Sequence, residues 1–174
     1  MKMVMPNNQL RLAGIVHDSI ADGPGLRMVV FVQGCPHQCK GCHNMHTWAF
    51  EDGEVWTNQK LIEELDGNPL ITGVTLSGGE PMMQAALLLQ FAKEVKRRAI
   101  ELAIYSGFLF EDIIKNKDKK ALLEQCDVLI DGKFEEDKKS LELNFRGSSN
   151  QRIIDVKSSL SAGRAVIIND GRWL

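Results

Sequence analysis

The sequence predicts an α/β fold, in which one domain spanning residues 1–174 forms an open, partial (β/α) barrel of about six mostly parallel strands. The first supporting observation is that short apolar segments typical of strands alternate along the chain with segments of helical periodicity. The second is that a chain of 174 residues, 44% of them hydrophobic, can enclose one sizeable core. About six strands are too few to close a (β/α) barrel, so we expect an open sheet covered by helices.

The first strand is predicted at residues 28–32, because Met-Val-Val-Phe-Val is a continuous apolar run typical of a buried strand. A helix is expected at residues 57–65, where the apolar residues fall on one face. The second strand is expected at residues 73–76, directly before the turn sequence Ser-Gly-Gly-Glu-Pro. The spacing between these two strands suits one βαβ unit.

A longer helix is predicted at residues 82–98, because apolar side chains recur there at helical spacing, with Lys93 and Arg97 on the opposite face. The remaining elements continue the same alternation. They are strands at residues 102–105 and 128–130 with a helix at residues 119–125 between them, and a last pair of strands at residues 153–156 and 165–168.

Composition excludes several classes of function. The net charge is −2, from 21 basic and 23 acidic residues, and the basic stretches at residues 96–98 and 115–120 are typical of solvated helix faces. We therefore expect neither nucleic acid nor a membrane as a partner. The sequence shows no apolar leader and no run long enough to span a membrane, so we expect a cytoplasmic protein.

The cysteines indicate a metal site rather than disulfides. Cys35, Cys39 and Cys42 form a Cys-x3-Cys-x2-Cys run on the loop that follows the first predicted strand. Three thiolates so placed can bind three irons of one [4Fe–4S] cluster and leave the fourth iron open to a substrate or cofactor. Cys126 stands apart at the start of a later strand, where we expect a buried and inert thiol.

A zinc site is the alternative interpretation of these cysteines. His37, His43 and His46 lie close to them, and three cysteines with one histidine are an accepted set of zinc ligands. The second ligand pair of a zinc knuckle is absent downstream. Histidines in a loop are more often solvated or hydrogen-bonded than bound to metal.

Two of these features together resemble the radical S-adenosylmethionine (SAM) superfamily: the cysteine run after the first strand, and Gly78-Gly79-Glu80-Pro81 after the second. The resemblance implies one [4Fe–4S] cluster held by the three cysteines and SAM chelated by the open iron. It also implies that Gly78, Gly79 and Glu80 contact the methionine part of SAM. A glycine pair allows close approach to a ligand, and a carboxylate suits an ammonium group.

Further segments resemble the activases of glycyl radical enzymes. They are Asp-Gly-Pro-Gly-Leu-Arg at residues 22–27, Trp48, and Phe-Arg-Gly-Ser-Ser-Asn-Gln at residues 145–151, the last of which resembles the activase of anaerobic ribonucleotide reductase. The resemblance implies an enzyme that cleaves SAM reductively and installs a glycyl radical on the large subunit of anaerobic ribonucleoside-triphosphate reductase. It implies a reduced electron donor such as flavodoxin. The alternatives are an activase of another glycyl radical enzyme, such as pyruvate formate-lyase, or a non-catalytic iron–sulfur electron-transfer module.

The resemblance also suggests roles for other residues. Gly41 stands where many radical SAM proteins have an aromatic residue near the adenine, so His43 is the candidate to cover that ring. Asp22 is expected near the incoming glycine loop, and Arg146 is an anion contact, a partner contact or a surface ion pair. Ser106, Asp131 and Lys133 follow the next two strands, where they bind the ribose or carboxylate of SAM or form surface turns.

Overall fold

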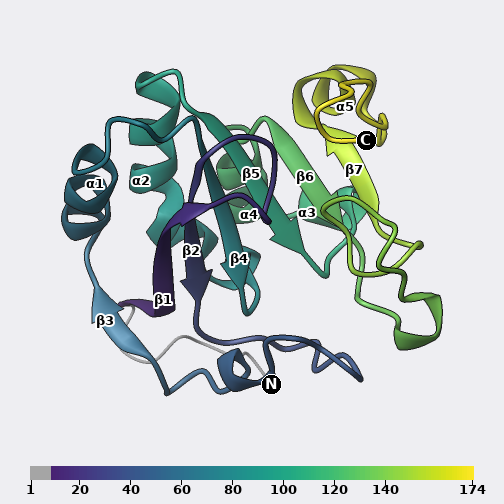
Figure 1. The fold of residues 1–174 in the computed structure, drawn as a ribbon, viewed down its shortest axis with the longest axis horizontal. Helices are drawn as coiled ribbons and strands as arrows, with labels where there is room; N and C mark the ends of the chain where they lie inside the picture. Colours follow the sequence, from purple (N-terminus) through teal and green to yellow (C-terminus); the bar gives the residue numbers. More distant parts are fainter. Residues whose placement is uncertain (1–8) are drawn as a thin grey trace.

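The computed structural model describes residues 9–174 and contains one mixed sheet of seven strands in the order β3-β1-β2-β4-β5-β6-β7 (Figure 1). The strands are β1 (Leu10–Ser19), β2 (Arg27–Val32), β3 (Glu54–Trp56), β4 (Gly73–Gly78), β5 (Glu101–Ser106), β6 (Val128–Asp131) and β7 (Arg152–Asp155). The α-helices are α1 (Asn58–Asp66), α2 (Ala85–Arg97), α3 (Phe110–Ile113), α4 (Lys117–Leu123) and α5 (Val156–Ala162). Short 3-10 helices are η2 (Met45–Thr47), η3 (Pro81–Gln84) and η4 (Glu136–Lys138).

The centre of the sheet is parallel and its edges are antiparallel. Strands β2, β4, β5 and β6 pair in parallel, whereas β1 pairs antiparallel with β2 and β3, and β7 pairs antiparallel with β6. Because β3 is antiparallel to β1, it runs in the same direction as the central four strands. The edge strands β3 and β7 do not pair with each other among the described residues. The prediction of an open α/β sheet of mostly parallel strands is therefore confirmed.

Four predicted strands, at residues 28–32, 73–76, 102–105 and 128–130, correspond to the parallel centre. The strand predicted at residues 153–156 is also present, but it ends at Asp155 because Val156 begins α5. The strand predicted at residues 165–168 was wrong. Only Ile167 forms a bridge there, with Ile154, while Ile168 packs into a small core beside β6 and β7. Strands β1 and β3 were not predicted.

The helices α1, α2 and α4 lie together on one face of the sheet (Figure 1). Their apolar stripes, which include Leu61, Leu88, Phe91 and Leu122, close the main core against the central strands. The predicted helix at residues 57–65 is α1, capped by the Thr57 hydroxyl. Among residues 9–174, no helix is both long and apolar enough to cross a membrane.

The opposite face has a smaller core over β5, β6 and β7. It contains Ile130 of β6, Ile153 of β7 and Trp173, and Trp173 lies in the segment after α5. Because β2, β4, β5 and β6 are parallel, their carboxyl ends all lie at one edge. The loop after β2 runs below the arrowheads of β2 and β4 in Figure 1. This edge carries most of the residues that the sequence singles out.

Candidate active site

The three clustered cysteines lie at the carboxyl edge of the parallel strands. Cys35, Cys39 and Cys42 are all free thiols and line one cavity of about 140 Å³. Strand β2 leads into their loop, and backbone bonds from Gly34 to the Thr47 carbonyl and from Cys35 to the Trp48 carbonyl fix where it starts. The structure therefore brings the predicted ligands together in one site.

Backbone amides lie near the sulfur atoms of Cys35 and Cys42. The Asn44 amide donates to Cys42 Sγ at 3.3 Å, and the amides of His37 and Gln38 are placed to stabilise the Cys35 thiolate. Burial raises the pKa of the Cys35 thiol, and these amides oppose that effect. Amides directed at sulfur are also a means by which proteins tune iron–sulfur clusters.

A cluster fits this donor set better than a single zinc ion does. Within residues 9–174, no three His, Cys, Asp or Glu side chains converge as one metal ion requires. A [4Fe–4S] cluster does not require its thiolates to meet at one ion, because each thiolate binds a different iron of the cluster. In addition, Trp48 lines the same cavity, and its buried indole N–H has no partner in the described part of the chain. The residues present thus fit a polar group in this cavity.

Gly41 is explained by the shape of the cysteine loop. Its φ of 75° lies in the left-handed region, and a Cβ there would approach the Glu136 carboxylate to 2.9 Å. An aromatic side chain at this position would have to displace Glu136. Because Gly41 does not line the cavity itself, its role in the structure is to let the loop turn beneath η4.

The end of β4 packs directly against the cysteine loop. A Cβ on Gly79 would lie 2.4 Å from the Gly34 carbonyl oxygen, and one on Gly78 would lie 2.6 Å from the backbone nitrogen of Val32. Only glycines permit this approach, which places the next residue, Glu80, beneath the cavity. The side chain of Glu80 is almost fully buried.

The Glu80 carboxylate is surrounded by donors from the protein. Its Oε1 accepts from the Ser106 hydroxyl at 2.9 Å and from the Met82 amide at 3.0 Å. Its Oε2 accepts from the Gly107 amide at 2.7 Å and lies 2.7 Å from His37 Nε2. His37 was considered at the sequence level only as a loop histidine or zinc ligand, and its pairing with Glu80 was not predicted.

The residues after β6 divide into two groups. Lys133 lines the cavity and a neighbouring hollow of about 500 Å³ that also contains His37 and Gly107. Asp131 lines neither of these. Its buried carboxylate accepts instead from the Phe110 amide at 2.7 Å and from Arg152 Nε at 2.9 Å, so it joins β6 to α3 and β7.

Another hollow, of about 360 Å³, shares Cys42 with the cysteine cavity and contains Asp22, His43 and Arg146. We call this one the second hollow. The His43 ring lies 5.5 Å from the ring of Phe134, an aromatic residue on the loop after β6 that the sequence patterns did not single out.

The segment at residues 145–151 folds over the end of β6. Gln151 donates to the Gly132 carbonyl at 3.0 Å and accepts from the Gly147 amide at 2.8 Å. Arg146 donates to the Gln151 carbonyl at 3.1 Å, and its buried Nε has no partner among residues 9–174. This segment therefore forms one wall of the second hollow.

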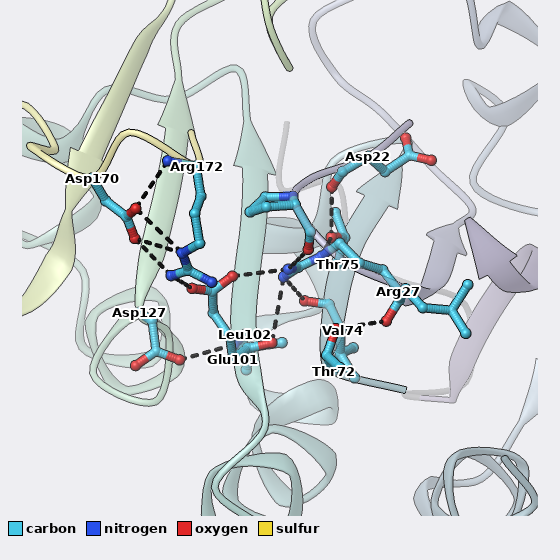
Figure 2. Close-up of polar contacts among 12 residues, drawn as sticks. Asp22, Arg27, Thr72, Val74, Thr75, Glu101, Leu102, Asp127, Asp170 and Arg172 are labelled. Carbon is cyan, nitrogen blue, oxygen red and sulfur yellow. Dashed lines mark hydrogen bonds and ion pairs between the residues drawn. The ribbon is translucent and has the colours of Figure 1, made fainter. Parts of the chain in front are cut away.

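The segment at residues 22–27 is held by a buried arginine, as Figure 2 shows. Arg27 Nε donates to the Thr75 hydroxyl at 2.8 Å, and that hydroxyl donates to the Asp22 carbonyl at 2.8 Å. The guanidinium also donates to the Pro24 carbonyl at 3.0 Å and to Glu101 Oε1 at 2.8 Å. The motif at residues 22–27 was noted from the sequence, but the fixing of the Asp22 loop by Arg27 was not predicted.

Comparison with known proteins agrees with this site. A family model described as a 4Fe-4S single cluster domain matches residues 21–154. Proteins named anaerobic ribonucleoside-triphosphate reductase-activating protein are 38% identical in Vibrio cholerae, over 77% of this chain and 90% of the relative, and 37% identical in Haemophilus influenzae, over the same shares. The protein of that name from Enterobacteria phage T4 is 37% identical over 76% of this chain and 85% of the relative.

Among solved structures, QueE from Escherichia coli is similar with a TM-score of 0.49 and 14% sequence identity, over 71% of each chain. The matches to the activating proteins extend over most of both chains, and the range matched by the iron–sulfur family model contains the cysteine loop and the end of β4. The chain therefore belongs to the family of the anaerobic ribonucleoside-triphosphate reductase-activating proteins.

Proposed function

We propose that this protein binds one [4Fe–4S] cluster and SAM and installs a glycyl radical on the large subunit of an anaerobic ribonucleoside-triphosphate reductase. One observation carries the proposal. In a chain of this family, three thiols of a single loop line one cavity together with the glycine-rich end of β4. Cys35, Cys39 and Cys42 would hold the cluster.

The cluster and SAM together supply the electron and the reactive radical that takes a hydrogen atom from a glycine Cα. The protein holds both in place and limits access of water. Gly78, Gly79 and Glu80 line the cavity beside the three thiols, so we assign the segment ending at Glu80 to the methionine part of SAM. The exposed ammonium group of Lys133 suits the SAM carboxylate.

The other predicted residues take supporting places. His43 and Phe134, whose ring centroids lie 5.5 Å apart, form an aromatic surface suited to stacking with the adenine. Ser106 lines the cavity where the ribose would lie. Gly41 lets the cysteine loop turn, and Asp131 supports the end of β6 from behind the cavity through Arg152.

The second hollow suits the polypeptide partner. It opens beside Cys42 and carries Asp22 and Arg146 on opposite loops, so a glycine-bearing segment of the reductase can enter it between one acidic and one basic side chain. Reacting atoms must come within about 3–3.5 Å of each other for efficient transfer, and the segment must therefore leave its own fold. A reduced flavodoxin is the class of electron donor that we propose.

The test is an anaerobic reaction of the reconstituted protein, reduced with dithionite, with SAM and the large subunit of the reductase. The expected products are methionine, 5′-deoxyadenosine and a glycine-centred doublet in the electron paramagnetic resonance spectrum, located on the reductase chain. Omission of SAM and the Cys39→Ala variant are the matched controls, and both should give no doublet. Replacing dithionite by reduced flavodoxin tests the proposed donor.

Two outcomes would contradict the proposal. A doublet that forms only with pyruvate formate-lyase would assign the protein to another glycyl radical enzyme. Cluster reduction without SAM cleavage, and without a radical on any partner, would leave only an electron-transfer module.

A further inference from the structure

His37 occupies a defined place between the cysteine loop and the sheet. It lies in sequence between Cys35 and Cys39, yet its side chain is only 7% exposed. Its Nε2 lies 2.7 Å from Glu80 Oε2, and its ring packs edge-on against Phe108 with centroids 4.6 Å apart. A loop histidine therefore reaches across to the ends of two strands.

The pocket around this imidazole is shaped for it. A Cβ on Gly107 would lie 2.4 Å from the His37 ring, so only glycine allows the strand end to approach this closely. The opposite side of the pocket is Phe108, whose ring is covered in turn by the Lys119 ammonium group at 3.5 Å from the centroid. Such packing fixes the orientation of His37 as well as its position.

The Glu80 carboxylate has its acceptor positions filled. An ionised carboxylate offers about four, and here the Met82 amide, the Ser106 hydroxyl, the Gly107 amide and His37 supply four donors. A direct bond to the ammonium group of SAM would have to replace one of them. His37 is the one donor of the four that the cysteine loop carries; the others belong to η3 and the end of β5.

We propose that His37 is a positioning residue, which locks the cysteine loop onto Glu80 and thereby holds the loop in the arrangement that binds the cluster. In this arrangement the Glu80 carboxylate supports SAM binding by holding the cysteine loop in place. It makes no hydrogen bond of its own to the SAM ammonium group. This proposal rests on the proposed function for its link to SAM. The lock itself, which is the contact between His37 and Glu80, forms within the protein and needs neither cluster nor SAM.

The first test uses the cluster-free protein, so that it does not depend on the proposed function. We expect His37→Ala and Glu80→Ala each to speed hydrogen exchange of the amides in residues 34–44, roughly tenfold or more, because each removes a buried hydrogen bond to a charged group. Exchange in the central strands should stay unchanged, which shows that both variants fold. His46→Ala, at an exposed histidine just beyond the loop, is the matched control and should show no effect.

The second test uses the reconstituted protein. His37→Ala and Glu80→Ala should both release iron to a chelator faster than the wild type. The double variant should be no worse than Glu80→Ala, because that substitution already breaks the contact with His37. His37→Gln, whose side-chain amide can still donate to Glu80, should restore slow iron release in part. SAM affinity, measured by calorimetry on samples of equal cluster content, should fall by similar factors in the two single variants.

Three results would overturn the lock. They are unchanged exchange and iron release in His37→Ala, additive effects in the double variant, or weaker SAM binding in Glu80→Ala alone. Tighter SAM binding in His37→Ala would show instead that His37 competes with SAM for Glu80. If the wild type takes up no cluster or SAM, the proposed function fails, and the exchange measurements still decide whether the lock exists.

Discussion

At the scale of single residues, the four cysteines differ in what surrounds their sulfur atoms. Cys126 is buried among apolar side chains of α4 and β6, and its thiol donates to the Leu122 carbonyl. Burial strongly raises the pKa of that thiol, so the thiolate that iron requires is disfavoured there. Burial also raises the pKa of Cys35, but backbone amides oppose the effect. Cys42 likewise accepts an amide hydrogen bond.

The first prediction follows from this contrast. Replacing Cys35, Cys39 or Cys42 with Ala should each abolish the anaerobically assembled cluster, because a cube held at two corners is poorly retained. Cys126→Ala should keep it and is the control for loss of a thiol. Iron and sulfide per chain, together with the visible absorption spectrum, measure the outcome. Full cluster content in Cys39→Ala would contradict the proposed ligands.

At the scale of elements, one carboxylate holds the end of β6 in place. Asp131 accepts from Arg152 of the antiparallel neighbour β7 and from the first amide of α3. Arg152 also pairs with Glu111 on α3, which is much more exposed. Three elements therefore meet at one buried charge, next to the loop that carries Lys133.

The second prediction concerns this junction. Asp131→Ala should lower the free energy of unfolding by about 3 kcal/mol, because it leaves a partly buried guanidinium and a helix amide without their acceptor. Glu111→Ala is the matched control on the same arginine and should cost about 0–1 kcal/mol. Denaturant midpoints at neutral pH measure both changes. An Asp131→Ala variant that keeps full stability but loses SAM affinity would instead make Asp131 a ligand contact.

The control pair also has a definite pH dependence. The Arg152 guanidinium lowers the pKa of the Glu111 carboxyl through their hydrogen bonds. A carboxyl whose pKa is lowered on folding stabilises the fold above its unfolded pKa, and that contribution is lost as the pH falls through the lowered value. The difference in stability between wild type and Glu111→Ala should therefore shrink in acid.

At the scale of the whole molecule, the end of the described chain holds together two segments that are far apart in sequence. Trp173 is fully buried, packs edge-on against Phe145 with centroids 5.3 Å apart, and lies 5.4 Å from the Arg27 guanidinium. Beside it, Arg172 pairs with Asp170 and with Glu101, the carboxylate that also binds Arg27 (Figure 2). Trp173 thereby connects the Asp22 loop, through Arg27, with the segment at residues 145–151, through Phe145.

The third prediction is that Trp173→Ala lowers the free energy of unfolding by about 3–5 kcal/mol, the usual cost of removing a buried aromatic side chain. It should also speed hydrogen exchange in residues 22–27 and 145–151 more than in the central strands. Leu174→Ala, at a neighbouring residue that is 56% exposed, should change neither. If the Trp173 substitution left the hydrogen exchange of both segments unchanged, the two segments would be held independently of the tryptophan.

The parallel centre of the fold could be predicted because its signals are local. A run such as residues 28–32 is apolar throughout, which a strand covered on both faces requires, and the stripe of α2 repeats at helical spacing. The edge strands carry weaker signals. Strand β1 mixes buried and exposed residues without a regular alternation, and β3 has three residues, so neither stands out from a loop. Residues 165–168 have a strand-like composition, yet they form a single bridge to β7 through Ile167, and only Ile168 packs into the small core.

The sequence by itself determined the α/β class, the order of the central strands along the chain, and the loop that carries Cys35, Cys39 and Cys42, because each depends on neighbouring residues. The tertiary structure alone decided which polar side chains form hydrogen bonds and ion pairs with other residues of the protein. Asp131 is bound by Arg152, and Glu80 by His37 and three other donors. These contacts depend on which strand ends become neighbours in the folded sheet, and no short stretch of sequence carries that information, because the partners of Glu80 lie up to 43 residues away.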